Sequence, residues 1–222
     1  MAIAFRSKTY SGIPLTGTGF TATESAGASE NDILLMWFGN NDGNALTTPP
    51  SGWTLIYANN STSQSLSCWL YYIRRGASAP SYTVAWTNSV YYEWSVTAWV
   101  GVITTGNPIN TSATTGILQN RDPANPDCPS ITTTVTNTMV LAVAGTWANL
   151  TSGFTPPSGY DLREGIISGA LCLASKNVAV AGVEDPGAYS GAPAGSSNVD
   201  EITVALIPNP YYQLVLMPQI LM

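Results

Sequence analysis

Acidic side chains are the first residues in this chain that could do chemistry. Two pairs of adjacent carboxylates occur, Glu184-Asp185 and Asp200-Glu201. A glycosidase needs two carboxylates facing each other across a cleft, whereas neighbouring residues on a strand point to opposite faces. The sequence also contains no histidine, which excludes Ser-His-Asp triads and histidine zinc sites. We therefore expect no catalytic residues and a protein that is not an enzyme.

Cysteines and oxygen-rich loops are the remaining candidates for redox or metal chemistry. The three cysteines, Cys68, Cys128 and Cys172, are predicted to be small buried core residues. A bridge between Cys68 and Cys172 is the alternative if two halves of the chain face each other. Residues 40–44 offer oxygen ligands, but they lack the later glutamate of a calcium loop and fit turn chemistry better. We expect no metal and no cofactor.

Aromatic residues gather between positions 86 and 99. Their rings could stack on sugars, and the predicted glycan-binding candidates are Trp86, Tyr92 and Trp94. The alternative is that they belong to a core or to a subunit interface, where tryptophan and tyrosine are also enriched.

An uncharged segment, residues 208–222, follows the last predicted strand. Its large apolar side chains would invite aggregation if left in water, and each stabilises by about 1.5–3 kcal/mol when buried. We expect it to dock on a neighbouring subunit by strand addition or by filling a groove; packing on its own domain is the alternative. The predicted partner-binding residues are Tyr211, Tyr212, Leu214, Val215, Leu216, Met217, Ile220 and Leu221.

The elements that must position these side chains occur twice. Thr48-Pro49-Pro50-Ser51-Gly52 recurs as Thr155-Pro156-Pro157-Ser158-Gly159, and a recurring turn suggests a duplicated structural unit. Three further segments match in the same order: Asn31–Met36 with Asn137–Ala142, Leu66–Leu70 with Ala170–Ala174, and Ser95–Val100 with Glu201–Leu206.

Strand signals dominate both halves, because apolar and alternating runs are separated by clusters of glycine, proline, asparagine and serine. We predict an all-β fold: a single jelly-roll-like β-sandwich built from two internal repeats, with an apolar C-terminal extension. The sandwich covers residues 1–207, with repeat one at about 20–103, a crossover at 104–129 and repeat two at about 130–207; the extension covers 208–222. Two tandem sandwiches are the alternative, although each half has few strands for that.

Composition narrows the class of protein. Only 9% of the residues are charged and 45% are hydrophobic, with a formal net charge of -6. Such a chain is not disordered, and it lacks the basic stripe of a nucleic-acid binder. No apolar stretch reaches membrane-spanning length, and the N-terminus does not read as a signal peptide. We expect a protein assembled in the cytoplasm, with no nucleic-acid and no membrane partner.

Three segments of the first half resemble a known module. They are Asn31-Asp32-Ile33-Leu34-Leu35-Met36, Pro49-Pro50-Ser51-Gly52-Trp53-Thr54-Leu55, and Leu70-Tyr71-Tyr72-Ile73 with Gly76-Ala77-Ser78. They are similar to a β-sandwich module of bacteriophage virion structural proteins, which also occurs in some bacterial surface proteins. The resemblance covers about residues 5 to 207, and Asn31 replaces the usual glycine before Asp32.

The resemblance implies a structural role in a virion, of the decoration or the tail and fibre type. The expected function is a capsid decoration protein that contacts the shell through its C-terminal segment and aromatic strands. Its expected partners are the major capsid protein or tail proteins, together with further copies of itself in a homo-oligomer. The alternative is a tail-tip or fibre adhesion module that binds host glycans.

Overall fold

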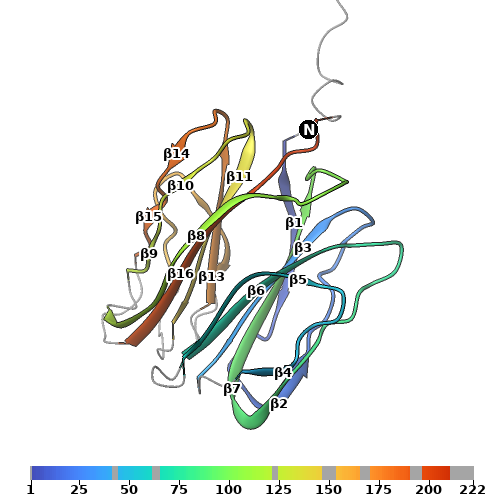
Figure 1. Cartoon of the computed structure of the whole chain (residues 1–222), viewed down its shortest axis with the longest axis vertical. Helices are drawn as coiled ribbons and strands as arrows, with labels where there is room; N and C mark the ends of the chain where they lie inside the picture. The colour runs from blue at the N-terminus through green and yellow to red at the C-terminus, as the bar shows by residue number, and fades with distance from the viewer. Residues whose placement is uncertain are drawn as a thin grey trace, which may run out of the picture.

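The computed structural model describes residues 2–41, 45–61, 66–121, 125–146, 154–165, 171–190 and 197–210. Two antiparallel β-sheets pack face to face within these ranges (Figure 1). The first sheet holds strands β1–β7, drawn in blue to green, and the second holds the long strands that follow. The predicted all-β sandwich is confirmed.

The first sheet has the strand order β1-β7-β3-β6-β5. Strands β2 and β4 pair with the first part of β7, which is long enough to serve both groups. The bounds are β1 (Ala4–Tyr10), β2 (Leu15–Thr21), β3 (Ile33–Asn40), β4 (Leu46–Thr48), β5 (Thr54–Ser61), β6 (Leu66–Arg74) and β7 (Thr83–Val100).

The second sheet has the order β12-β13-β11-β16-β8. Two pairs of short strands, β9 with β15 and β10 with β14, lie outside it. The bounds are β8 (Ile109–Arg121), β9 (Asp127–Cys128), β10 (Ile131–Thr132), β11 (Thr138–Thr146), β12 (Asp161–Gly165), β13 (Leu171–Val178), β14 (Val183–Glu184), β15 (Gly187–Ala188) and β16 (Ser197–Leu206).

The two sheets share one strand order. Reading the second sheet from β8 gives β8-β16-β11-β13-β12, which matches β1-β7-β3-β6-β5 strand for strand. Each half of the chain therefore builds one sheet. The turn residues correspond as well, because Gly52 and Gly159 have φ angles of 82° and 79°.

Strand β8 lies inside the segment predicted as a crossover, residues 104–129. Its threonines and isoleucines favour a pleated strand, and it pairs with β16 along most of its length. Prolines at positions 108 and 123 bracket the strand without interrupting it. The segment predicted as an irregular crossover therefore contains a 13-residue strand.

The cysteine pairing differs from the sequence-based alignment by one residue. Gly39 of β3 lies opposite Cys68, whereas the equivalent Gly145 of β11 lies opposite Leu171. Cys68 therefore corresponds to Leu171, and Cys172 points to the other face of its sheet. Cys68 belongs to the core between the sheets and Cys172 to the core outside the second sheet. Both are free thiols, so the alternative of a bridge between them is wrong.

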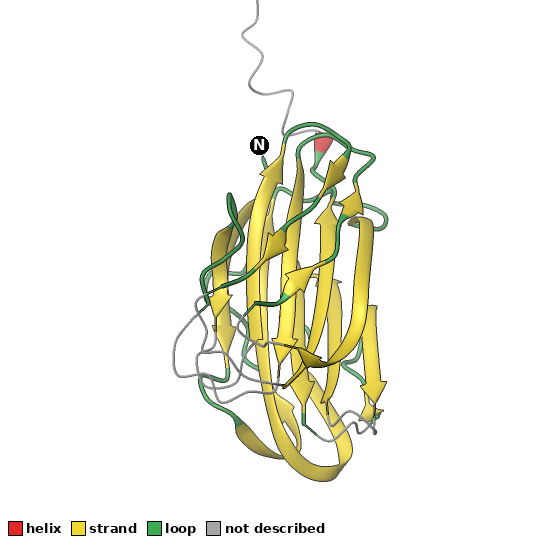
Figure 2. Ribbon diagram, turned by 90° about the vertical axis from the view of Figure 1, so that its left-hand side faces the viewer, coloured by secondary structure: helices red, strands yellow, loops and turns green. Residues whose placement is uncertain are grey.

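Three apolar layers hold the fold together. The central layer lies between the sheets, and its largest side chains include Trp37 and Trp99. A second layer covers the outer face of the first sheet, where β2, β4 and the start of β7 fold over β3 and β6. The third covers the outer face of the second sheet beneath the short strands, which cross in front of it in Figure 2. In the described part of the chain no helix is long and apolar enough to span a membrane.

Asn31 and Asn137 adopt a left-handed backbone conformation at equivalent positions, two residues before β3 and one residue before β11. Their φ angles are 69° and 58°. Glycine tolerates this region freely, asparagine tolerates it moderately, and other residues are strained there. Asparagine at both positions therefore holds a backbone conformation that glycine would also tolerate.

We expect Asn31→Ala to lower the free energy of unfolding by about 1 kcal/mol, because alanine cannot relieve the left-handed strain. Asn31→Gly should be close to neutral. Urea unfolding followed by tryptophan fluorescence measures both variants. Equal destabilisation by alanine and glycine would mean that the asparagine side chain, and not the backbone conformation, is what the fold needs.

Candidate functional site

Two acidic residues lie at equivalent positions deep between the sheets. Glu93 of β7 lies opposite Gly39 of β3, and Asp200 of β16 lies opposite Gly145 of β11. Both acids are almost fully buried. The duplication has thus placed one carboxyl group in each sheet at the same point of the strand order, although the two residue types differ.

Glu93 lies in a polar cluster formed by Glu93, Ser95, Glu164 and Lys8, which we call the Glu93 cluster. Lys8 of edge strand β1 reaches Glu164 of edge strand β12, with Nζ 3.2 Å from Oε1. The Ser95 hydroxyl donates to Glu164 Oε2 at 3.4 Å, and the Gly165 amide donates to Oε1 at 3.0 Å. Glu164 is therefore well satisfied, and its contacts join the two sheets at one side of the sandwich.

Glu93 itself is not satisfied in this way. Neither of its carboxyl oxygens has a hydrogen-bonding partner among the described residues. Burial, followed by the nearby charge of Glu164, raises the pKa of Glu93 to about 8. Burial also raises the pKa of Glu164, against the lowering effect of Lys8. Glu93 is accordingly protonated at neutral pH, which avoids an uncompensated charge in the core.

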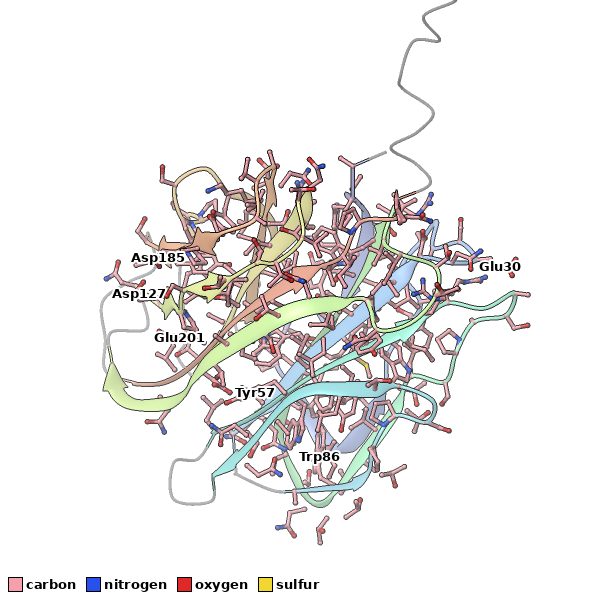
Figure 3. All side chains as sticks on the ribbon, turned by 45° about the horizontal axis from the view of Figure 1, so that its top comes forward. Glu30, Tyr57, Trp86, Asp127, Asp185 and Glu201 are labelled. Atoms are coloured by element: carbon pink, nitrogen blue, oxygen red, sulfur yellow. The ribbon has the colours of Figure 1, made fainter. Side chains whose placement is uncertain are left out.

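Asp200 lies in a second cluster, formed by Asp200, Tyr57 and Cys68, on the opposite side of the sandwich. The Tyr57 hydroxyl donates to Asp200 Oδ1 at 2.7 Å, and the Cys68 thiol is a further hydrogen-bonding partner. Burial raises the pKa of Asp200 to about 7, and these two contacts lower it in part. Tyr57 comes from β5, and Figure 3 shows it near the middle of the sandwich. This contact also joins the two sheets.

Tyr57 and Glu164 are themselves equivalent residues. Tyr57 lies opposite Leu70 in the first sheet, and Glu164 lies opposite Leu173 in the second. Each comes from an edge strand and contacts the opposing sheet. Tyr57 contacts Asp200, and Glu164 contacts Ser95, close to Glu93. The two clusters therefore occupy equivalent positions in the two sheets.

The space around these carboxyl groups is too small for a substrate. A cavity of about 10 Å³ lies beside Glu93 and Cys68, which is close to the room that one water needs. Ordinary ligand pockets are of the order of 300 Å³ or more. Two carboxyl groups with raised pKa values resemble an acid and base pair, but they lie in a packed core and not along a cleft. Their geometry supports a role in holding the sheets together.

The adjacent acid pairs of the sequence make separate contacts. Glu201 accepts a hydrogen bond from the Asp127 amide at 2.8 Å, on the other side of its strand from Asp200. Glu184 accepts from the Tyr160 hydroxyl at 3.0 Å and pairs with Lys176 Nζ at 2.6 Å. Figure 3 labels Asp127, Asp185 and Glu201 at this end of the second sheet. In the described part of the chain, no three acidic or cysteine side chains gather closely enough to hold a metal ion.

The predicted glycan-binding residues lie in the apolar layer outside the first sheet. Trp86, Tyr92 and Trp94 are all buried there, and each ring packs against Phe20. The Trp86 indole nitrogen donates to the Gly17 carbonyl at 2.9 Å. These three rings present no open face on which a sugar could stack. They belong to a core, which was the alternative to glycan binding in the sequence analysis.

The predicted partner-binding residues, Tyr211 to Leu221, lie outside the described residues, but the segment that leads to them is described. Pro208 forms a β-bridge with Val102, and the Asn209 amide donates to the Gly101 carbonyl at 2.8 Å. Asn209 is buried. The chain is therefore firmly attached to one end of the sandwich at the point where residues 211–222 begin.

Sequence reasoning missed Glu93 and Asp200 as a related pair. The sequence match aligns Ser95 with Glu201. Moving this alignment by one residue pairs Ser95 with Ile202, and it then pairs Glu93 with Asp200. Comparison of the chain with protein-family models, with curated proteins and with solved structures found no match.

Proposed function

We propose that this protein is a non-enzymatic structural protein of a bacteriophage virion, and that it decorates and stabilises the capsid. Residues 211–222 are its contact with the major capsid protein or with another virion protein. The resemblance of residues 5 to 207 to a virion module motivates the setting. The structure supports a scaffold role, because its buried acids join the sheets and its aromatic rings fill a core.

One observation carries the proposal. An uncharged segment rich in leucine, tyrosine and methionine begins at an anchor that the fold holds in place through Pro208 and Asn209. A fixed starting point limits the conformational entropy that docking must overcome. A protein that binds only the assembled shell stabilises that shell by mass action. The aromatic strands, in contrast, are occupied internally, so docking onto other virion subunits falls to residues 211–222.

Removal of residues 211–222 tests this function directly. We expect the shortened protein to keep its thermal unfolding transition but to fall at least about tenfold in copies per particle, because the apolar anchors of an interface carry most of its affinity. Quantitative mass spectrometry of purified particles measures the copy number. A control with Gln219→Ala, which keeps all apolar anchors, should be incorporated normally. Full occupancy by the shortened protein would refute the proposal.

The adhesion alternative is not supported by the residues predicted for it. It needs exposed aromatic rings, and Trp86, Tyr92 and Trp94 are buried. We therefore propose no glycan-binding function.

A further inference from the structure

The two sides of the sandwich differ sharply in charge. On one side β1 lies against β12, and on the other β5 lies against β8. The β1 and β12 side carries Arg6, Lys8, Asp161, Arg163 and Glu164. The β5 and β8 side carries a single charged residue, Arg121, at the far end of β8. Because the strand orders correspond, these sides are equivalent positions of the duplicated unit, so each is a control for the other.

Charged side chains on edge strands protect them from pairing with other chains. On the protected side, Arg163 pairs with Asp161 at 2.7 Å and its guanidinium lies over the Phe5 ring, 5.3 Å from the centroid. The ion pair between Lys8 and Glu164 lies on the same side. The β5 and β8 side lacks such protection along nearly its whole length, and this difference marks it as a surface for a partner strand.

A groove runs along the uncharged side between β5 and β8. Its walls include Leu55, Tyr72, Asn107, Ile109 and Ser112. Leu55 is 47% exposed, so a large apolar side chain stands at the groove without a cover. The Tyr72 hydroxyl donates to Asn107 Oδ1 at 3.3 Å and forms the polar end of the groove.

Leu55 has an equivalent on the protected side. Leu55 lies opposite Tyr71, Leu162 lies opposite Ala174, and each strand has a bulge directly afterwards. Leu162 is similarly exposed, at 40%, but it stands between Asp161 and Arg163. The two leucines therefore match in fold and exposure, and they differ in the charges around them.

We propose that the groove between β5 and β8 receives residues 211–222 of a second copy of this protein. The inference rests on the proposed function of that segment as a docking element and identifies the virion protein that it contacts as a second copy of this protein. The segment adds as an extended strand along the uncharged side, and its apolar side chains cover Leu55. Copies linked in this way form an oligomer on the particle surface.

The segment and the groove share an absence of charge, although the walls of the groove are more polar than apolar. Residues 211–217 contain no charge, so the interface buries no unpaired ion. In an extended strand Tyr212, Leu214 and Leu216 would share one face, which is apolar apart from the Tyr212 hydroxyl. Seven residues span roughly 24 Å at the rise of a β-strand, which is comparable with the length of β5, and Pro218 ends the pairing.

The path of the anchored segment favours a second copy over the same chain. Leu206 pairs with Ile109 at the start of β8, whereas Asn209 is bonded to Gly101, at the end of β7. A Cβ on Gly101 would lie 2.9 Å from the Ala2 carbonyl, so this point is beside the start of β1. The chain thus leads from the β8 side toward the β1 side before residue 211 begins. To reach the groove of its own chain, the segment would have to turn back toward β8. The segment of a neighbouring copy can enter the groove without such a turn.

Charge placed in the groove provides the first test, with the full-length protein. Sedimentation equilibrium should show concentration-dependent self-association of the wild type. We expect Leu55→Lys to weaken association by at least about tenfold, because a buried unpaired ammonium is strongly unfavourable. The matched control Leu162→Lys should associate like the wild type. A wild type that stays monomeric, or equal loss in both variants, would overturn the assignment.

Photo-crosslinking provides a second test that does not depend on a destabilising change. Leu55→p-benzoylphenylalanine is placed in an equal mixture of ¹⁵N-labelled and unlabelled full-length protein. The expected products join position 55 to residues 211–222 in peptides of mixed isotope composition, and Leu162→p-benzoylphenylalanine should form none. Products within one copy only would show that the segment folds back on its own chain, and products with other segments would reject the groove. If removal of residues 211–222 lowers particle occupancy while Leu55→Lys has no effect on association, the proposed function survives and this inference fails.

Discussion

The contribution of Glu93 to the free energy of unfolding is expected to fall by on the order of 4 kcal/mol between about pH 5 and pH 8, and this part of the pH dependence should be absent in Glu93→Gln. The cause is the carboxyl group of Glu93, which is buried without a hydrogen-bonding partner among the described residues. Burial and the charge of Glu164 raise its pKa to about 8. A glutamine of the same shape remains neutral throughout this range.

The direction follows from comparing the folded and unfolded chains. Below the ordinary glutamate pKa, both states keep the proton, and stability is insensitive to pH. Between that value and about 8, the unfolded chain loses the proton while the folded chain retains it. Unfolding then releases a proton, so each pH unit removes about 1.4 kcal/mol of stability. Above the folded pKa both states are ionised and the curve flattens.

Asp200 should add to the same trend at lower pH. Its pKa is raised to about 7, so its contribution is complete near neutral pH, where that of Glu93 continues. The groups around the two acids are Glu164 and Lys8 on the edge strands, Tyr57 on β5, and Cys68 on β6. Asp200→Asn together with Glu93→Gln should therefore give a flatter profile than either change alone.

Chemical denaturation at several pH values measures this dependence, and the slope is more informative than the absolute stability. Glu30→Gln is the matched control, because Glu30 is exposed and lies at the periphery of the molecule in Figure 3. It makes the same Glu→Gln change at an exposed position, where no buried carboxyl group is removed. A Glu93→Gln variant with the slope of the wild type would mean that Glu93 is ionised in the folded protein, contrary to our account.

The all-β sandwich could be predicted because its signals are local and repeated. Apolar runs such as Ile33–Asn40 have strand length, and the Pro-Pro-Ser-Gly turn recurs with its glycine in the left-handed region. Both faces of β6 carry apolar or aromatic side chains, and the structure covers one face with the central layer and the other with the outer layer. Such features depend on short-range chemistry, and the sequence displays that chemistry directly.

The inner polar clusters could not be predicted, because they depend on register. A shift of one residue in the match between Ser95–Val100 and the end of the chain hides the equivalence of Glu93 and Asp200. In strands the same shift exchanges the buried and outer faces. The side-chain role of an acid on a strand is therefore decided by cross-strand pairing, which the sequence does not specify by itself.

The aromatic residues show a related limit. Trp86, Tyr92 and Trp94 have the composition of a sugar platform, and they lie in a core because β7 is long enough to fold its first part over the sheet. That fold-over requires β2 to pair closely with β7. The closest approach in this pairing is at Gly19, which lies beside the bulge of β2.

Gly19→Ala is expected to be strongly destabilising, by about 3 kcal/mol or more, because the new methyl group meets backbone atoms. A Cβ at this position would lie 2.3 Å from the Val84 carbonyl oxygen and 2.9 Å from the Ala85 Cα. Neither atom belongs to a side chain that could rotate away. The strands must therefore separate, which loosens the cover over Phe20 and Trp86.

Gly17→Ala in the same strand is the matched control. Its Cβ would lie 3.5 Å from the nearest atom, which is ordinary contact, so we expect a change below about 1 kcal/mol. Thermal unfolding followed by near-ultraviolet circular dichroism reports both stability and the packing of the aromatic layer. If Gly19→Ala alone loses the aromatic signal, the pairing of β2 with β7 is what turns these rings inward. If both variants behave alike, the cover over this face does not depend on the close approach at Gly19, and the burial of Trp86 must be attributed to β7 alone.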